Sequence, residues 1–199
     1  MTEVVAFHVI LTCYGFWLPN DPRGSWSTRV WAKHLRRFGP ATGEYMQRSS
    51  AGDPHDWRIR KLAKSALKFP AVVLSGKQAL CVATAFGQCL SNQRIRCFAC
   101  AVLPEHSHLV LENTEQDIDA LMIDLKAAAV KHLLDARLHP FQEFADRQLK
   151  IPKMWARNGF KTFLFDHDEV VERIHYVEDN PLEAGLKRQQ WSFVVGVDE

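Results

Sequence analysis

The sequence has no long apolar run and few cysteines, and both absences exclude classes of protein. Its apolar runs are all short, for example Ala71-Val72-Val73-Leu74, so we expect no membrane-spanning segment. No basic and apolar leader opens the chain, so we expect no signal peptide. The five cysteines are an odd number, which favours free thiols in a reducing compartment. Cys97 and Cys100 form a CxxC pair, but no second pair follows at zinc-finger spacing.

Acidic residues are scarce between Arg23 and Lys68, where eleven lysines and arginines stand against three acids. Trp26, Trp31 and Trp57 are interleaved with these cations. A basic segment with aromatic rings suits a phosphate backbone and unstacked bases, and the alternative is a solvated basic loop. The residues of this segment that we expect to bind DNA are Arg23, Arg36 and Arg37.

The hydrophobic pattern predicts an α+β fold. Strands are expected at 4–12, 95–103 and 106–112, with a short terminal strand at 191–195, and helices at 30–37, 57–67, 76–92, 115–136 and 168–178. The core order β-α-β-β-α is ferredoxin-like, with an antiparallel sheet and helices on one face, although no fourth strand is evident. We expect one domain over 1–199, with a basic insertion at 14–75 and a C-terminal helical extension at 154–199.

His106 and His108 are one residue apart on a predicted strand, so their side chains project from the same face. Two imidazoles placed in this way can share a divalent ion and leave positions open for a phosphate oxygen. The alternative is a pair of ordinary surface histidines. The third ligand stays open among His8, His167 and Asp168, because alternation turns Glu105 to the other face and Glu112 lies about 13 Å from His108 along the strand.

Three segments of the chain resemble the HUH single-tyrosine transposases, in particular their REP-associated members. The segment VLPEHSHLVL at 102–111 is similar to the histidine hairpin of that family. The segment FHVILTCYGFWLP at 7–19 is similar to its first strand and the following loop, and YVEDNPLEAGL at 176–186 is similar to its last helix. Together the three segments reach across nearly the whole chain.

This resemblance implies a protein that binds single-stranded or hairpin DNA and acts in DNA transposition. It implies Mg²⁺ or Mn²⁺ held by His106 and His108, and a tyrosine that attacks a phosphate to form a 5′-phosphotyrosine intermediate. It further implies a bacterial cytoplasmic protein with no membrane partner, and it allows a homodimer.

The chain departs from the family pattern at two positions. Ser107 replaces a bulky apolar residue within the histidine motif, and it should face away from the metal. In the segment MWARNGFK at 154–161, where the resemblance implies the nucleophile, Phe160 replaces tyrosine. Arg157 and Lys161 flank this position and are candidates for holding the phosphodiester.

The remaining candidates for a nucleophile are Tyr14, after the first strand, and Tyr176, in the last helix, where packing is its default role. Tyr45 is the third tyrosine of the chain. Two further alternatives stay open: a metal-activated water in place of a tyrosine, and a non-catalytic DNA-binding or regulatory descendant.

Overall fold

The computed structural model describes residues 3–19, 21, 29–41 and 56–197. The chain divides into two compact units, and each is described by itself. The core unit comprises Met1–Thr12 and Val73–Glu199, and the inserted unit comprises Cys13–Val72. The limits of the inserted unit lie close to the insertion expected at 14–75. Within the described residues, no helix is both long and apolar enough to cross a bilayer.

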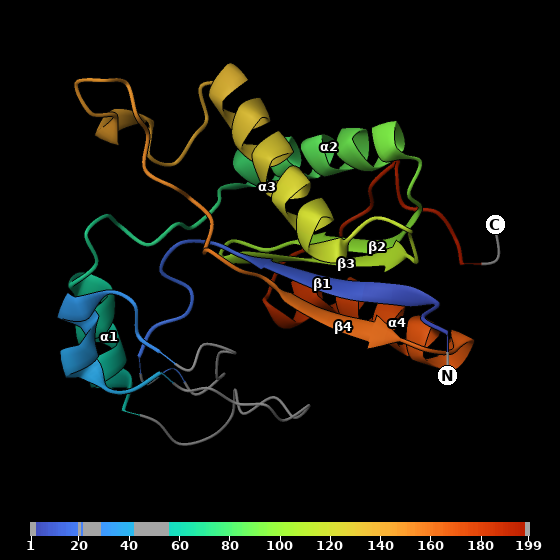
Figure 1. The fold of residues 1–199 in the computed structure, drawn as a ribbon, viewed down its shortest axis with the longest axis horizontal. Helices are drawn as coiled ribbons and strands as arrows, with labels where there is room; N and C mark the ends of the chain where they lie inside the picture. The colour runs from blue at the N-terminus through green and yellow to red at the C-terminus, as the bar shows by residue number, and fades with distance from the viewer. Residues whose placement is uncertain (1–2, 20, 22–28, 42–55, 198–199) are drawn as a thin grey trace. The chain divides into compact units, whose positions relative to one another are not determined.

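The core unit is built on a four-stranded antiparallel sheet (Figure 1). Its strands are β1 (Ala6–Thr12), β2 (Cys97–Val102), β3 (His106–Glu112) and β4 (Phe160–Leu164), in the order β2-β3-β1-β4. The elements of this unit follow one another as β1-α2-β2-β3-α3-β4-α4. This is the ferredoxin-like arrangement, so the predicted fold class is confirmed.

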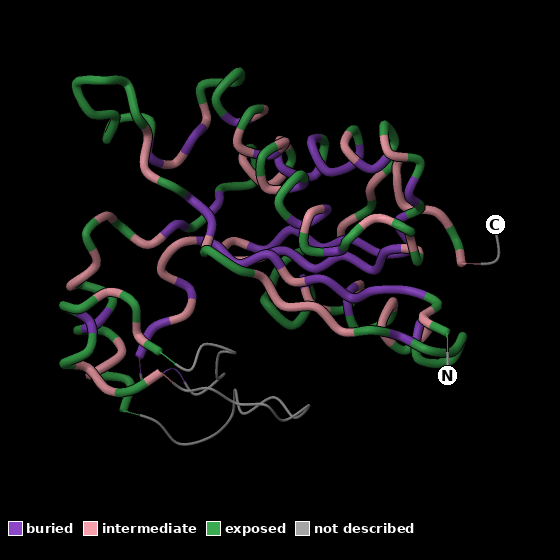
Figure 2. Tube along the Cα trace, in the orientation of Figure 1, coloured by how far each residue is buried: buried purple, intermediate pink, exposed green. Residues whose placement is uncertain are grey.

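Helices α2 (Gly76–Gln93) and α3 (Ile118–Asp135) cover one face of the sheet, and α4 (His167–Glu183) covers the other (Figure 1). α2 begins with a capping box, in which the Ser75 hydroxyl accepts from the Gln78 amide and the Gln78 side chain accepts from Ser75. Under α4, strand residues such as Val110 pack against Val170 and Val177 in a continuous apolar cluster. The strands are the most deeply buried part of the core unit (Figure 2).

Strand β4 is the fourth strand that the hydrophobic pattern did not show. It lies at an edge of the sheet, and only Leu164 of its five residues is fully buried. A half-covered edge strand lacks the clean alternation that reveals a strand in sequence. The extension expected at 154–199 is therefore a strand followed by a helix.

Helix α4 begins as predicted and ends later. Asp166 caps it by accepting from the Glu169 amide at 2.8 Å. The helix expected at 168–178 stops short of Pro181, but α4 passes through Pro181 and continues to Glu183, because a proline in the last turn removes only one backbone bond. The actual stop is Gly185, whose φ of 72° lets the Leu186 amide return to the Pro181 carbonyl at 2.7 Å.

Two other expected elements differ from the structure. The helix predicted at 30–37 is a 3₁₀ helix, η1 (Lys33–Phe38). The terminal strand predicted at 191–195 is reduced to one parallel bridge between Cys97 and Val194. Further along the chain, a second short 3₁₀ helix, η2 (Gln142–Phe144), lies between α3 and β4.

The inserted unit has a small core of its own. Helix α1 (Trp57–Ser65) places Ala63 against Leu18 and Leu35. Asp21 is 1% exposed and forms an ion pair with Arg60 at 3.4 Å. This unit therefore holds its shape with few buried side chains, and most of α1 faces outward (Figure 2).

Candidate functional site

The two histidines of the motif project from the face of the sheet that α4 covers. His106 pairs with Thr12 of β1, His108 pairs with Ile10, and the rings of the two histidines have centroids 4.8 Å apart. His108 is 2% exposed, whereas His106 is half-buried at the start of β3. Ser107 projects to the opposite face, as expected, and is fully buried there.

A third histidine, His8 of β1, completes this cluster. Its ring stacks on that of His108 with centroids 5.2 Å apart and planes at 9°. His8 Nε2 and His108 Nδ1 are 3.0 Å apart, which is a hydrogen bond between the rings. His8 was one of the open third-ligand candidates, and the structure places it behind His108 as a hydrogen-bonding partner.

Burial keeps these imidazoles neutral. Desolvation, with a smaller contribution from the nearby Arg173, lowers the pKa of His8 to about 3. Desolvation also lowers the pKa of His108 well below its ordinary value, helped by His106, His8 and Arg173. The neutral ring is the form that binds metal.

One ring nitrogen of His108, Nε2, is suited to bind a cation. A neutral imidazole carries one N–H and one lone pair. When His108 Nδ1–H donates to His8, the lone pair of His108 lies on Nε2, which is buried and has no hydrogen-bond partner. Metal-bound histidines commonly donate their other ring N–H to a second residue in this way. Among the described residues, however, no group of three His, Cys, Asp or Glu side chains is placed to hold a metal.

The topology places Glu112, His167 and Asp168 at the end of the sheet opposite to His106. Glu112 pairs with Ala6, at the end of β1 opposite to Thr12, and its carboxylate binds Arg96 at 3.1 Å. His167 and Asp168 follow β4, whose last residue Leu164 also pairs with Ala6. Six residues of strand separate the two ends by about 20 Å. Glu105 lies in the bend before β3.

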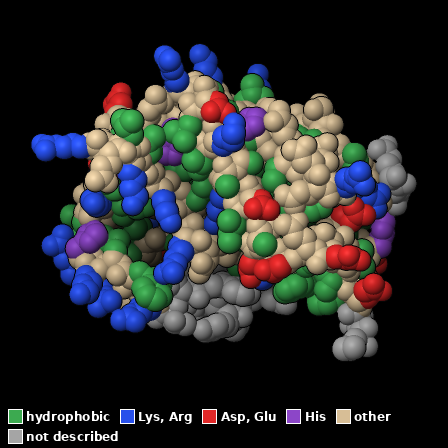
Figure 3. All heavy atoms as spheres, turned by 45° about the horizontal axis from the view of Figure 1, so that its top comes forward, with side chains coloured by type: hydrophobic (Ala, Val, Ile, Leu, Met, Phe, Trp, Pro, Cys, Tyr) green, Lys and Arg blue, Asp and Glu red, His purple; other side chains and the backbone are tan. Residues whose placement is uncertain are grey.

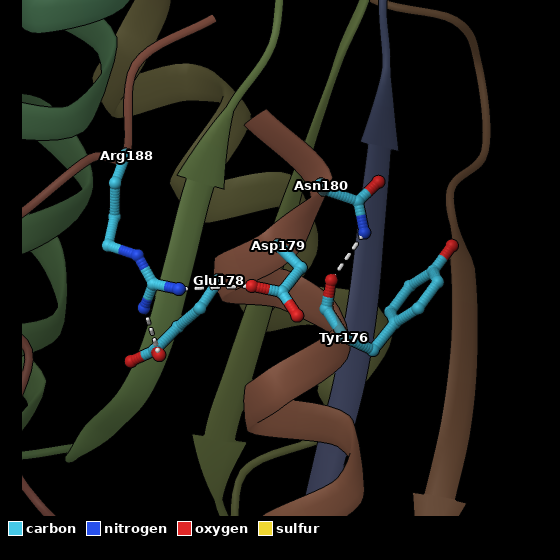
Figure 4. A network of polar contacts seen from close by, with 5 residues as sticks. All are labelled: Tyr176, Glu178, Asp179, Asn180 and Arg188. Atoms are coloured by element: carbon cyan, nitrogen blue, oxygen red, sulfur yellow. Dashed lines mark hydrogen bonds and ion pairs between the residues drawn. The ribbon is translucent and has the colours of Figure 1, made fainter. Parts of the chain in front are cut away.

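Tyr176 of α4 contacts the histidine cluster. Its ring meets His108 edge-on at 5.7 Å and His8 edge-on at 5.9 Å between centroids, and the Arg173 guanidinium lies 5.4 Å from its centre. The ring is 44% exposed. In Figure 4 its hydroxyl points toward the end of the sheet at which β1 terminates, which is the end where Thr12 pairs with His106.

Asn180 lies one helical turn beyond Tyr176 in the same direction (Figure 4). Its side-chain amide donates to the Tyr176 carbonyl at 2.6 Å, so its side-chain oxygen is directed elsewhere. Arg188 binds Glu178 at 3.0 Å and Asp179 at 3.1 Å, which fastens the chain after α4 to this part of the helix. Asn180 was not among the residues expected from the sequence, although its spacing of four from Tyr176 was the available signal.

Phe160, where the resemblance implies the nucleophile, and the two other tyrosines are each described by their own surroundings. Phe160 begins β4 and pairs with Ile10, which in turn pairs with His108. Phe160 is therefore two strands away from His108, a total of about 10 Å. Tyr14 belongs to the inserted unit, where its ring lies 6.3 Å from Phe69. Tyr45 lies outside the described residues.

Two of the predicted DNA-binding residues, Arg157 and Lys161, belong to the core unit, and they lie in different places there. Lys161 pairs with Val9, projects from the face opposite to the histidines and binds Asp119 at 2.6 Å, so it does not share the face of the histidine pair. Arg157 is exposed and follows Ala156, whose amide donates to the Thr12 carbonyl at 2.9 Å. Arg157 therefore lies at the His106 end of the sheet.

In the inserted unit, Arg36 Nε donates to the Val30 carbonyl at 3.0 Å, and the Arg37 guanidinium lies 4.8 Å from the Phe38 ring centre. Arg23 lies outside the described residues.

Comparison with known proteins gives structural likeness only. No protein-family model and no curated protein matches the sequence. The fold is similar to two solved transposase structures. One is a REP-associated tyrosine transposase bound to a REP hairpin, with a TM-score of 0.48 and 11% identity over 96% of this chain and 76% of that one. The other is a proposed transposase of Deinococcus radiodurans R1, with a TM-score of 0.43 and 13% identity over 90% of this chain and 92% of that one.

Proposed function

We propose that this protein cleaves and rejoins single-stranded DNA in transposition, with Tyr176 as the nucleophile. One observation carries the proposal: the Tyr176 ring lies against two buried, neutral histidines of a candidate metal site. A phenol beside a divalent-metal site is suited to nucleophilic attack on phosphorus. Figure 4 supports this role, because the hydroxyl points to the end of the sheet where His106 begins β3.

His106 and His108 would hold Mg²⁺ or Mn²⁺, and the Asn180 side-chain oxygen is the proposed third protein ligand. A bound divalent ion would polarise the scissile phosphate and stabilise the charge that develops on it. An amide oxygen suits both ions, and two imidazoles with one oxygen leave coordination positions for phosphate and water. His8 would act behind His108 and fix the direction of its lone pair.

The proposed reaction is a transesterification. The Tyr176 oxygen forms a bond to phosphorus and loses its proton to solvent. The bond between phosphorus and the 3′ oxygen breaks, and that oxygen takes up a proton to leave as a 3′ hydroxyl. The DNA stays attached through a 5′-phosphotyrosine, and attack by a 3′ hydroxyl reverses the step and rejoins a strand. Arg157, exposed at the same end of the sheet, is placed to bind the flanking phosphates.

A second function is a DNA-binding protein without cleavage. The observation that favours it is that, among the described residues, no third His, Cys, Asp or Glu is placed to hold a metal together with the histidine pair. A site with two histidines and one amide would bind a divalent ion more weakly than a site with a carboxylate ligand.

Cleavage of labelled DNA separates the two functions. The protein is incubated with Mn²⁺ and single strands that carry a hairpin, since one of the similar solved structures holds a REP hairpin. We expect a cleaved strand and a protein–DNA adduct that survives denaturant, both lost in Tyr176→Phe and in His106→Ala with His108→Ala, and both retained in Tyr14→Phe. Cleavage without an adduct would indicate an activated water, and binding without cleavage would establish the second function.

A further inference from the structure

The described part of the inserted unit is strongly basic. It contains nine lysines and arginines and two aspartates, within residues 13–19, 21, 29–41 and 56–72. Both aspartates already serve the fold, because Asp21 pairs with Arg60 in the interior and Asp56 caps α1. In the space-filling view, lysine and arginine side chains gather with apolar ones over the region that this unit forms (Figure 3). The surface of the unit therefore complements a polyanion.

The outer side of α1 combines an aromatic ring with cations. Trp57, Arg58 and Lys61 lie within about 100° of helix circumference and are all exposed, whereas the buried Ala63 faces the small core. Trp57 is 60% exposed, and a large apolar ring is seldom so exposed unless it belongs to a binding surface. The Arg58 guanidinium lies 5.6 Å from the Trp57 ring centre.

The positive charges near the N-terminus of α1 are unfavourable for the stability of the helix. Its first turn contains no acidic residue and holds Arg58 next to the positive end of the helix dipole, in addition to Arg60, which is paired with Asp21. Arg58 and Lys61 are three residues apart, so these like charges also repel each other. Cations in these positions lower helix stability in the free protein. A bound polyanion would remove both penalties.

The same pairing of ring and cation recurs through the inserted unit. Arg29 lies 5.4 Å from the centre of Trp31, whose side chain is 64% exposed, and Lys68 lies 5.3 Å from the centre of Phe69. Exposed rings flanked by cations can stack on bases while the cations contact the adjacent phosphates. Bases in a duplex are already stacked on each other, so this surface fits a single strand better than a duplex.

We infer that the outer face of α1 is a single-stranded DNA-binding surface, on which Trp57 stacks on a base and Arg58 and Lys61 contact phosphates. The inference deepens the proposed function, because it names a place where the substrate strand is held. It does not require cleavage, so the surface is measurable without divalent metal.

Binding of a fluorescent 20-nucleotide oligo(dT) is measured by anisotropy in EDTA over a range of salt concentrations. The test variant is Arg58→Glu with Lys61→Glu. Arg58 lies in the first turn of α1, where an acidic replacement stabilises the helix, and Lys61 is exposed, so lost binding by this variant is not explained by unfolding of α1. The matched control is Lys77→Glu with Lys150→Glu, which makes the same charge change at two exposed lysines of the core unit. Trp57→Ala and Trp57→Phe test the ring.

We expect the α1 double variant to bind oligo(dT) at least tenfold more weakly, with a salt slope smaller by about 1.4 for two lost phosphate contacts. Trp57→Ala should weaken binding about fivefold or more, and Trp57→Phe should keep most of it. The control double variant should change affinity less than twofold. An equal loss of affinity in both double variants would show that only the net charge of the protein matters, and it would overturn the inference. Tighter binding of duplex DNA or of oligo(rU) than of oligo(dT) would overturn it as well.

Cleavage by the wild type and DNA binding by the α1 variants are measured separately, and together they keep the two proposals apart. If the wild type cleaves no DNA but the α1 variants lose binding, the proposed function fails and this inference stands. If the wild type forms the adduct but the α1 variants bind normally, the inference fails alone.

Discussion

His8 Nε2 lies 3.0 Å from His108 Nδ1, and this contact joins the first strand of the sheet to the histidine motif on β3. The hydrogen bond occupies one nitrogen of His108 and leaves the other, Nε2, buried without a partner. A ring fixed in this way can present its lone pair in one direction only. The two strands together therefore define a candidate metal position that neither would define alone.

His8→Ala should weaken Mn²⁺ binding by about 10- to 100-fold, which is the usual effect of losing the partner behind a metal-bound histidine. His8→Gln should restore part of the affinity, because its side-chain oxygen can accept from His108 Nδ1. Mn²⁺ titration followed by electron paramagnetic resonance measures both. Unchanged affinity in His8→Ala would show that His8 only packs against the sheet.

The buried histidines should make stability depend on pH. Their pKa values are lowered in the folded protein, so the unfolded chain binds more protons below its ordinary histidine pKa of about 6.5. Unfolding free energy is therefore fully present above that pH and is lost as the pH falls toward the folded value of about 3 for His8. By pH 5 the loss should reach about 2 kcal/mol for His8, and His108 should add to it in the same direction.

Urea unfolding in EDTA between pH 7.5 and 5 measures this loss. The double variant His8→Asn with His108→Asn lacks both groups and should show a smaller dependence on pH. The same pH dependence in the wild type and in this variant would mean that other groups cause it.

Asn180→Ala should weaken Mn²⁺ binding about tenfold and slow cleavage, because it removes the proposed third ligand oxygen. Asn180→Asp keeps an oxygen at the same place and should bind the metal at least as well as the wild type. Calorimetric titration of Mn²⁺ into both variants is the measurement. If Asn180→Ala binds like the wild type, the helix supplies no ligand from this position.

Gly159→Ala should destabilise the core unit by about 1–3 kcal/mol. A Cβ at Gly159 would meet Met122 Cε and would lie 2.7 Å from the Ile10 carbonyl oxygen, where β4 begins beside β1. Gly76→Ala is the matched control, because a Cβ at that helix position meets nothing within 4 Å. The control should be neutral or stabilising in thermal unfolding. Equal stability of the two variants would contradict the close packing at Gly159.

The sequence predicted most of the core unit because its strongest signals are local. Strand β3 and helices α2 and α3 carry complete apolar faces, and they appear close to their predicted limits. Strand β4 was missed because an edge strand needs only one apolar side, and its single fully buried residue is Leu164. Pro181 was read as a helix end because a proline usually stops a helix, whereas here Gly185 does so.

The candidate site was predicted only where it is local in sequence. His106 and His108 share a strand face whatever the tertiary structure. The contact between Tyr176 and His108 joins residues from α4 and β3, and it depends on which face of the sheet α4 covers. The face from which Lys161 projects also depends on the tertiary structure, because it is set by the pairing of Lys161 with Val9.

Mass spectrometry of the covalent adduct tests the central claim most directly. After reaction with Mn²⁺ and a hairpin-bearing single strand, the protein is digested with trypsin and nuclease. We expect a nucleotide attached to Tyr176, in the peptide that spans residues 174–187. Cleaved DNA with the nucleotide on Tyr14 or Tyr45, or with no modified peptide at all, would contradict it.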